Sequence, residues 1–437
     1  MGRQAAEEAA QSIGVVDNQA LQDYVHGIGT AMAAQSERPN LPWTFRVVDD
    51  PTPNAFALPG GYIFVTRGLL GLINSEAELA GVIGHEIGHV TARHSVTMLS
   101  RAQITQLGLG IGSILVPQIA QAAQIASAGL QLLFLRYGRD AERQADDLGF
   151  RYALQQNYDV RTMVNVFAQL KRSSEAAGQS PLPEWLASHP YPEERMERIQ
   201  AKLDTLSRDL NDARRNVDTY MNRIDGVVYG DNPRAGFFEG SLFLHPDLEF
   251  RLRFPQGWRF QNLAQAVTGV SERQDAIMQL TLAAGSETQA ANQFFAQQGL
   301  SAGQISRTSV NGNPAVIGYF QAQTQDGTVG GIAAFISFRN RTYQILAYTP
   351  AQLLDSYDRV FRDAIGSFDR LTDSRALNVQ PNRIDIVRPT QAMTLSEFNR
   401  RYPSTVGIDE IALINQLEGP SARIPAGQPV KRVVAGN

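Results

Sequence analysis

The chain has 437 residues, which exceeds one ordinary hydrophobic core and favours two or three domains. A hydrophobic fraction of 43%, a charged fraction of 19% and a net charge of -4 describe a globular protein and give no reason to expect nucleic acid as a partner. The chain has no cysteine, which excludes disulfides and thiolate metal sites, so any metal must be held by His, Asp or Glu.

The first residues, MGRQAAEEAAQSIGVV, lack the apolar core of a secretion signal. The residues therefore leave two compartments open, namely the cytoplasm and, after removal of a leader segment, the cell envelope. Apolar residues then recur at helical spacing in residues 17–35 and predict an amphipathic helix. Two short runs at 43–48 and 62–66 have the composition of strands, with a Pro- and Gly-bearing stretch between them.

Ser75 marks the beginning of the next predicted helix. Glu78 follows three residues later, which is typical of a capping box, and the helical pattern extends over residues 77–94. Helical patterns continue with few breaks to about residue 224. We therefore expect the first half of the chain to be mostly helical, with a small sheet.

The segment Ile104–Leu135 is apolar enough to raise the question of a membrane span. Glutamines recur within it and Pro117 interrupts it, whereas a spanning helix needs about 20 consecutive, mostly apolar residues. The composition favours a helical hairpin packed on the domain, with membrane contact as the alternative.

After Gly226 the pattern changes to strands. Residues 240–372 alternate strand-like runs with two short helical patterns, at 288–298 and 351–366, which indicates an α+β domain. A proline-punctuated segment with two helical pieces follows. The predicted fold class is α+β, and the predicted domains are residues 1–226, 238–372 and 376–437.

The sequence H-E-I-G-H at 85–89 carries the clearest chemical signal. Positions i and i+4 share a helix face, so His85 and His89 direct their imidazoles at one point. Glu86 flanks that point, close enough to act through a metal-bound water and not as a ligand itself. Zinc suits two neutral imidazoles plus one carboxylate, because a fourth position stays open for chemistry. A chance pentapeptide on a surface helix is the alternative, and we reject it since the chain has only six histidines.

A carboxylate ligand is then needed, and R-D-A-E-R-Q-A-D-D at 139–147 supplies a candidate. Glu142 and Asp146 lie one helical turn apart on one face, so Glu142 is placed as the third ligand and Asp146 as acceptor for the other ring N–H of a ligand histidine. Taken alone, the segment fits a solvated helix face better, with ion pairs from Arg139 and Arg143. The preceding histidine motif reverses this preference.

The other histidines receive weaker assignments. His94 follows His85 by nine residues, which on a continuous helix turns it to the opposite side. His26 and His245 stand in unrelated contexts. His189 lies in S-H-P-Y-P-E-E-R, a proline-stiffened loop followed by a helix carrying Arg195, and the residues by themselves favour a turn histidine over one that reaches the metal.

Four segments together resemble the gluzincin family that includes the HtpX membrane protease, the CaaX prenyl protease and the periplasmic protease-chaperone BepA. They are NAFALPGGYIFVTRGLL at 54–70, HEIGHVTARH at 85–94, RDAERQADDLG at 139–149 and SHPYPEERM at 188–196, in the order of the family. The resemblance covers the first 224 residues.

The resemblance implies one Zn2+ per chain. The implied ligands are His85, His89 and Glu142. It further implies Glu86 as catalytic base, with active-site roles for His189 and Arg195. His189 would be a transition-state donor or, as in some members, a resting zinc ligand.

Two features depart from the family pattern, the first from its membrane-bound members and the second from BepA-like proteins, which carry helical repeats after the protease domain. The single apolar segment is interrupted, which favours the exported branch and a periplasmic or cell-envelope location. The domain at 238–372 resembles the PsbP/DcrB-type fold, and the tail resembles a degenerate LysM module that lacks the usual Gly-Asp before Thr394-Leu395. Proximity to membrane or peptidoglycan is thus an expectation, and the oligomeric state is left open.

We expect a zinc-dependent endopeptidase acting on unfolded or misassembled proteins in envelope quality control, a substrate class implied by the resemblance. The substrate backbone is expected to add as a strand along an edge. That edge consists of Asn54, Ala55, Phe56, Ala57 and Leu58. The alternative is a latent zinc metalloprotein, acting as a chaperone or scaffold and gated by His189. A third interpretation is an adaptor protein that its C-terminal modules anchor to glycan.

Overall fold

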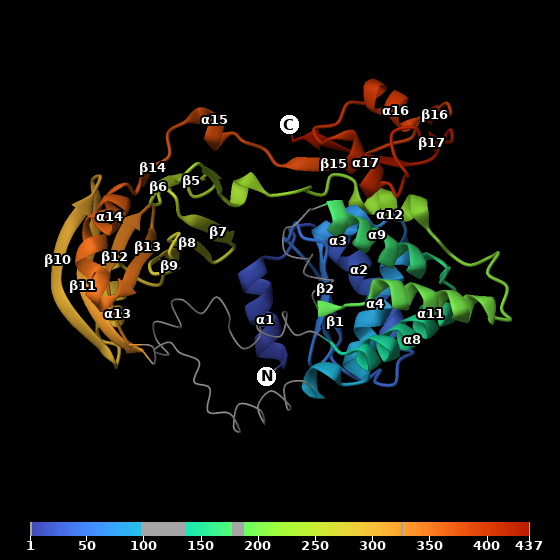
Figure 1. Cartoon of the computed structure of the whole chain (residues 1–437), viewed down its shortest axis with the longest axis horizontal. Coiled ribbons are helices and arrows are strands. Elements are labelled where there is room, and N and C mark those ends of the chain that lie inside the picture. Colours follow the sequence, from blue (N-terminus) through green and yellow to red (C-terminus); the bar gives the residue numbers. More distant parts are fainter. Residues whose placement is uncertain (1, 98–136, 177–187, 325–326, 437) are drawn as a thin grey trace. The chain divides into compact units, whose positions relative to one another are not determined.

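The computed structural model of the chain describes residues 2–97, 137–176, 188–324 and 327–436. The predicted hairpin at 104–135 lies outside these residues. By its internal contacts the chain divides into two compact units, one with the described residues up to Asp231 and from Pro381 onward, the other with Asn232–Gln380 (Figure 1). Helices and strands occur in both units, which confirms the α+β prediction. The division into three domains stays a prediction.

The first unit consists mainly of helices around a three-stranded sheet. Its helices before Asp231 are α1 (Gly2–Ile13), α2 (Gln19–Ala33), α3 (Arg67–Leu72), α4 (Glu76–Thr91), α8 (Arg139–Gln155), α9 (Thr162–Ala176), α11 (Pro192–Asp204) and α12 (Val217–Ile224). Its strands there are β1 (Thr44–Val48), β2 (Ala55–Leu58) and β3 (Tyr62–Thr66). In the described part of the chain, no helix is both long and apolar enough to cross a bilayer.

The small sheet has the order β1-β3-β2, with β1 parallel and β2 antiparallel to β3. Alternate residues of these strands face opposite sides, so the sheet separates two apolar clusters. Phe56 and Phe64 stack with ring centroids 4.9 Å apart and pack with the alanines of α1. Ala57 and Ile63 face the main core, which α2 and α4 also line. The sheet is therefore covered on both faces.

Helix α4 begins as the sequence predicts, with one difference. The Ser75 hydroxyl accepts a hydrogen bond from the Glu78 amide at 3.2 Å, which caps the first turn. The Glu78 carboxylate, however, accepts from the Asn74 amide at 2.6 Å, one residue before the position that a capping box requires. Gln416 also donates to Glu78 at 2.9 Å, so a residue far along the chain contributes to this helix end.

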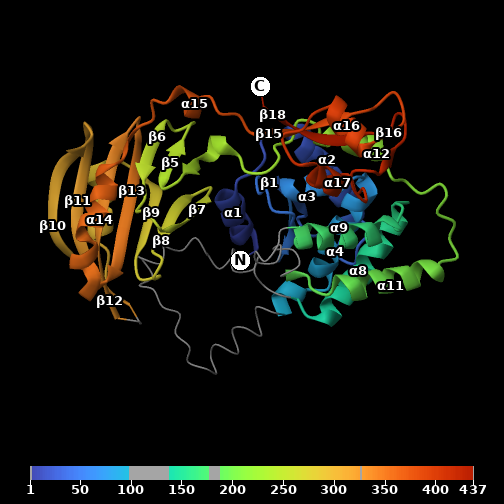
Figure 2. The same cartoon turned by 45° about the horizontal axis from the view of Figure 1, so that its top comes forward.

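The C-terminal segment packs within the first unit (Figure 2). Its elements are β15 (Asn382–Val387), β16 (Met393–Thr394), α16 (Leu395–Arg401), α17 (Ile408–Ile414), β17 (Arg423–Ile424) and β18 (Val430–Ala435). Lys431 is fully buried, and its ammonium donates to the carbonyl oxygens of Gly71 at 2.6 Å and Ile73 at 2.9 Å. Ile384 joins the main core. This segment is thus anchored directly before α4.

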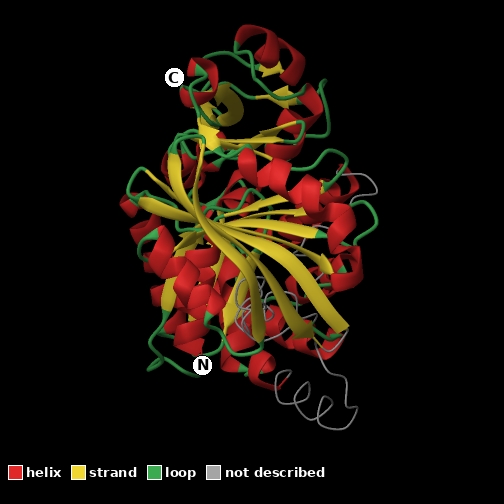
Figure 3. Ribbon diagram, turned by 90° about the vertical axis from the view of Figure 1, so that its left-hand side faces the viewer, coloured by secondary structure: helices red, strands yellow, loops and turns green. Residues whose placement is uncertain are grey.

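The second unit contains a seven-stranded sheet with the order β10-β11-β12-β13-β9-β8-β7 and a four-stranded sheet with the order β14-β6-β5-β4. Its strands are β4 (Phe237–Glu239), β5 (Leu242–His245), β6 (Phe250–Arg253), β7 (Arg259–Leu263), β8 (Ala266–Val270), β9 (Ile277–Ala283), β10 (Leu300–Val310), β11 (Asn313–Thr324), β12 (Gly327–Phe338), β13 (Arg341–Pro350) and β14 (Asp369–Arg370). Its helices are α13 (Glu287–Phe295), α14 (Leu354–Gly366) and α15 (Ser374–Leu377). Figure 3 shows the long strands fanning out with a marked twist.

Helices α13 and α14 cover opposite faces of the long sheet. Phe294 of α13 packs with Phe335, whereas Phe361 of α14 packs with the neighbouring Ile336. Both helices follow the two predicted helical patterns. Strands β6, β9, β11, β12 and β13 follow the strand-like runs LEFRLRF, DAIMQLTLA, AVIGYFQAQ, GGIAAFISF and TYQILAYT. Strand β10 was not predicted, because it is an edge strand whose residues are mostly exposed and polar, so it lacks the apolar alternation of a half-buried strand.

Candidate metal centre

Glycines let helices α4 and α8 approach closely. A Cβ atom at Gly84 would lie 3.0 Å from the carbonyl oxygen of Gly149, and one at Gly88 would lie 2.9 Å from that of Ala145. A Cβ atom at Gly149 would lie 2.7 Å from the backbone nitrogen of His85. Larger side chains would force the helices apart, so these glycines set the spacing at which the carboxylates of α8 reach the histidines of α4.

Four buried side chains converge at this helix pair. The ligand atoms of His85, His89, Glu142 and His189 all lie within 4.8 Å of one another. The Nε2 atoms of His85 and His89 are 2.9 Å apart, and Oε2 of Glu142 lies 3.6 Å from the first. Nδ1 of His189 lies 3.0 Å from Oε1 of Glu142. The structure therefore brings the three predicted ligands together and adds His189.

The donor set fits zinc. Bonds of about 2.1 Å to imidazole nitrogen and carboxylate oxygen place tetrahedral ligand atoms about 3.4 Å apart, close to the separations found here. Burial lowers the pKa of His85 and of His89, which favours the neutral imidazole that binds metal. Burial opposes ionisation of Glu142, but the charges of His189 and Arg195 outweigh it and hold its pKa well below the ordinary value. Each group is thus in its metal-binding form.

Glu86 lies beside the cluster as an acid–base group. Its side chain is fully buried, and neither carboxylate oxygen has a hydrogen bond within the described residues. Oε1 lies 3.6 Å from Nε2 of His189. Burial raises the pKa of Glu86 to about 7, so the carboxyl group exchanges its proton near neutral pH.

Asp146 joins His85, one of the predicted ligands, to the buried Arg195. Its Oδ1 lies 2.9 Å from Nδ1 of His85, the side of the ring away from the cluster. Arg195 of α11 donates from Nε to Oδ2 at 2.8 Å and from Nη2 to Oδ1 at 2.6 Å. Burial alone would raise the pKa of Asp146, but Arg195 and the hydrogen bond from His85 outweigh it and hold the pKa at about 2.

Arg195 also reaches the carboxylate ligand, since its Nη1 lies 2.9 Å from Oε2 of Glu142. The guanidinium group stacks on Phe167, 4.2 Å from the ring centroid, and is 2% exposed. Arg195 therefore neutralises two buried carboxylates and fixes their orientation.

The loop before α11 holds His189 against the cluster. Its neighbour Ser188 accepts a backbone hydrogen bond from Tyr137 at 3.0 Å, and Tyr191 adopts a left-handed conformation with φ of 69° directly before Pro192 begins the helix. His189 is 1% exposed, and its Nδ1 lies 3.2 Å from Nε2 of His85. The local sequence favoured a turn histidine. The geometry instead supports a histidine that reaches the cluster.

His94 lies against a ligand histidine, and the prediction that it turns away is wrong. Helix α4 ends at Thr91, and Arg93 takes a positive φ of 61°, so the chain folds back. Nδ1 of His94 is 2.9 Å from Nδ1 of His89, and its Nε2 is 3.1 Å from Oε1 of Gln144. No glycine or proline marks this helix end, so the sequence carried no signal for it.

Tyr137 was also missed by the sequence reasoning. Its ring stacks on that of His89, with centroids 3.9 Å apart and planes 25° apart. Its hydroxyl group lies 2.8 Å from Oγ of Ser95. Tyr137 follows the apolar segment directly and belongs to none of the predicted motifs, so the sequence offered no reason to single it out.

The predicted substrate edge corresponds to Asn54 and strand β2. This strand is the outer member of the sheet β1-β3-β2, and its four residues are buried. It packs beside α4, because Ala55 and Ala57 share the main apolar cluster with Ile83 and Ile87. The assignment of this edge to substrate stays a prediction.

Solved structures resemble the chain only distantly. The solution structure of cyanobacterial PsbP from Synechocystis sp. PCC 6803 has a TM-score of 0.26 and 14% identity, and the match covers 30% of this chain and 94% of that one. The Ran-binding protein Mog1p of Saccharomyces cerevisiae has a TM-score of 0.23 and 12% identity, over 29% and 92% of the two chains. The PsbP/DcrB-like description of residues 238–372 stays a prediction.

Sequence comparisons concern the first unit. The beta-barrel assembly-enhancing protease of Yersinia pestis is 30% identical over 185 residues, which are 40% of this chain and 37% of the relative. The mitochondrial metalloendopeptidase OMA1 of Arabidopsis thaliana is 32% identical over 176 residues, which are 40% and 35%. The chain thus matches little more than a third of these relatives. Residues 19–203 match the profile of Peptidase family M48.

Proposed function

We propose that this protein is a zinc-dependent endopeptidase that cleaves unfolded or misassembled polypeptides in the cell envelope. The observation that carries the proposal is the buried cluster of His85, His89, Glu142 and His189 with the buried carboxylate of Glu86 beside it, whose oxygens accept no hydrogen bond within the described residues. A structural metal site needs only its ligands and does not require a further buried carboxyl group with a raised pKa. A hydrolytic site needs one, because the attacking water must lose a proton.

Zinc, when bound by His85, His89 and Glu142, supplies a Lewis acid that polarises the scissile carbonyl and acidifies water. Glu86 accepts the proton of the attacking water. Its pKa of about 7 then allows the same carboxyl group to deliver that proton to the leaving amine nitrogen. The dry surroundings strengthen both transfers, since the side chain is 0% exposed.

His189 is assigned to stabilise the oxyanion that forms on the substrate. Burial would lower its pKa, but the charges of Glu142 and Glu86 outweigh it and raise the pKa above the ordinary value, which favours the protonated ring. A ring N–H of His189 beside the cluster can donate a hydrogen bond where negative charge develops. Arg195 contributes as a positioning residue, because it holds Glu142 directly and His85 through Asp146.

The substrate backbone is proposed to pair with the edge at Asn54–Leu58. Strand β2 is the last strand of its sheet on that side, and a peptide added there uses main-chain hydrogen bonds that do not depend on sequence. Weak side-chain selection suits unfolded substrates. The names of the two relatives, a beta-barrel assembly-enhancing protease and a mitochondrial metalloendopeptidase, support polypeptide substrates. The first name, which refers to the assembly of beta-barrels, is the basis for proposing the cell envelope.

A second candidate is a latent metalloprotein that acts as a chaperone or scaffold. The observation in its favour is His189 itself, whose Nδ1 stands 3.2 Å from Nε2 of His85 and completes a four-residue donor set. If His189 closes the site permanently, the zinc-loaded protein binds unfolded casein without cleaving it. X-ray absorption of the zinc-loaded protein then shows four protein ligands both with and without a bound inhibitor peptide.

The proposed function is tested with the zinc-loaded full chain and unfolded casein. We expect cleavage that a chelator abolishes and added zinc restores. A thiol-blocking reagent should have no effect, because the chain has no cysteine. Cleavage that persists in the metal-free protein would contradict the proposal.

A further inference from the structure

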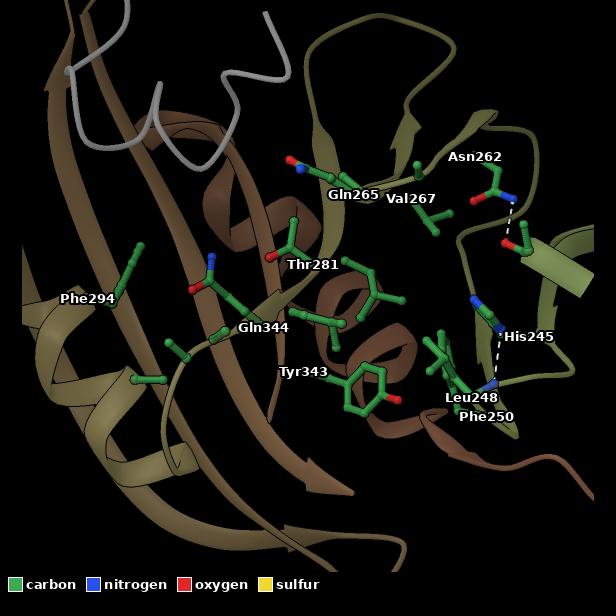
Figure 4. Close-up of a pocket in the computed structure, with 18 of the residues that line it drawn as sticks. His245, Leu248, Phe250, Asn262, Gln265, Val267, Thr281, Phe294, Tyr343 and Gln344 are labelled. Carbon is green, nitrogen blue, oxygen red and sulfur yellow. Dashed lines mark hydrogen bonds between the residues drawn. The ribbon is translucent and has the colours of Figure 1, made fainter. Parts of the chain in front are cut away.

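The second unit contains a cavity of about 650 Å3 that the peptidase chemistry does not use. It opens between the end of β9, helix α13 and the residues that join β5 to β6 (Figure 4). Leu248 and Phe250 line one side and Phe294 the other, with Tyr343 and Gln344 of β13 between them. This volume is typical of sites that bind a ligand.

Two polar atoms on the wall of the cavity lack partners among the described residues. They are the hydroxyl group of Tyr343 and Oε1 of Gln297. Tyr343 is 1% exposed, and Figure 4 shows its hydroxyl directed toward the side with Leu248 and Phe250. A buried polar group without a hydrogen bond is costly, which is a reason to expect a ligand that supplies one.

The described residues that line the cavity include no Asp, Glu, Lys or Arg. Their polar groups are amides and hydroxyls, such as those of Gln265, Gln293 and Thr281. Burial lowers the pKa of His245 to about 4, so this ring is neutral as well. A charged ligand would lose its hydration without compensation, so the cavity selects an uncharged one.

One wall of the cavity is a strand edge. The pairing of β8 with β9 ends at Ala266 and Thr281, whereas β9 continues along β13 to Ala283. Within the described residues, Leu282 and Ala283 thus have a strand neighbour on one side only. Leu282 is 49% exposed at this point. An open strand edge beside an uncharged cavity is an arrangement that accepts an extended peptide as an added strand.

We propose that this cavity binds an extended, uncharged polypeptide segment that pairs with β9 at Leu282–Ala283 and places an apolar side chain between Phe250 and Phe294. The proposal rests on the proposed function, since such a segment belongs to a polypeptide substrate. The site would hold part of a long substrate away from the peptide bond that is cleaved. A neutral small amphiphile and the chain's own segment 104–135 are the rival occupants.

The test uses the zinc-loaded full chain and a fluorescein-labelled ten-residue peptide of alternating valine and threonine. Leu282→Asp places a charge at the edge, and we expect it to weaken binding, measured by fluorescence anisotropy, at least about tenfold. The matched control is Ile305→Asp. Ile305 is 46% exposed, lies on β10 of the same unit and does not line the cavity, so binding should change less than about twofold.

Two further measurements distinguish the occupants. A peptide with alternate N-methylated residues cannot pair as a strand. If this peptide binds as tightly as the unmethylated one, and an uncharged detergent displaces both, the occupant is a small amphiphile and not a polypeptide. A photo-reactive residue at position 282 that crosslinks to residues 104–135, and not to added peptide, would assign the cavity to the chain itself. Either outcome overturns the proposal.

Tyr343→Phe removes the unpartnered hydroxyl without emptying the core. We expect unchanged or raised thermal stability and peptide binding weakened about two- to tenfold. Equal peptide binding by wild type, Leu282→Asp and Tyr343→Phe would refute the site, even if casein is cleaved. Selective loss of peptide binding in a protein that cleaves nothing would support the site and refute the proposed function. The two claims therefore fail separately.

Discussion

Asp146→Ala removes the residue that joins the metal cluster to Arg195. Asp146 is 2% exposed and accepts two hydrogen bonds from Arg195 and one from His85. Its pKa is lowered from 3.8 to about 2, which corresponds to about 2 kcal/mol of favourable interaction of the carboxylate. Truncating Asp146 also leaves the buried guanidinium group of Arg195 with one carboxylate partner fewer. Breaking a buried pair in this way costs about 3–5 kcal/mol of folding free energy.

The assay is urea unfolding of the metal-free chain, followed by tryptophan fluorescence. A Trp258→Phe background removes the one tryptophan between residues 232 and 380, so that the signal follows the first unit. The matched control is Asp147→Ala. The side chain of Asp147 is 43% exposed and pairs with Arg198 at 3.2 Å and Lys202 at 2.9 Å, so we expect a loss below about 1 kcal/mol.

Zinc affinity gives a second readout of the same variants. Asp146→Ala should weaken zinc binding about 10- to 100-fold in a chelator competition, because His85 loses the acceptor that fixes its ring. Asp147→Ala should leave it unchanged. If both variants unfold at the same urea concentration and bind zinc equally, the role assigned to Asp146 is refuted.

Three further predictions concern ligation, the oxyanion and the C-terminal segment. Glu142→Ala should lower zinc affinity more than Asp146→Ala does, because it removes a ligand; the reverse order in zinc titrations would exchange their roles. His189→Ala should lower kcat on a short peptide about 10²–10³-fold with zinc retained. A rise in kcat would mean that His189 chiefly blocks access to the metal site at rest. Burial lowers the pKa of Lys431 to about 7, below its unfolded value of 10.5. Between these two pH values only the unfolded chain holds the proton on Lys431. The unfolding free energy of the wild type, measured relative to Lys431→Met, should therefore rise with pH by up to about 1.4 kcal/mol per pH unit. Urea unfolding at pH 7.5 and 9.5 checks this, and a constant difference would contradict it.

The cluster was predictable because its spacing is local. His85 and His89 are one turn apart on one helix, and so are Glu142 and Asp146, so helical geometry alone orients each pair. That the two helices meet depends on the close approach at Gly84 and Gly149, and no local pattern reports such a contact.

The sequence did not reveal the contacts that depend on distant segments. Lys431 lies in VKRVV, a run whose charges look solvent-facing, yet its ammonium is buried against the chain just before α4. His94 was misplaced because the reasoning continued a helix that ends at Thr91. In both cases tertiary contacts override the local pattern.

The most direct test of the central claim is Glu86→Gln, measured for zinc content and casein cleavage together. Glutamine keeps the size of the side chain but cannot accept the proton of the attacking water. The account predicts a folded protein with one bound zinc per chain and cleavage below a few per cent of the wild-type rate. Full zinc occupancy with wild-type cleavage would contradict it.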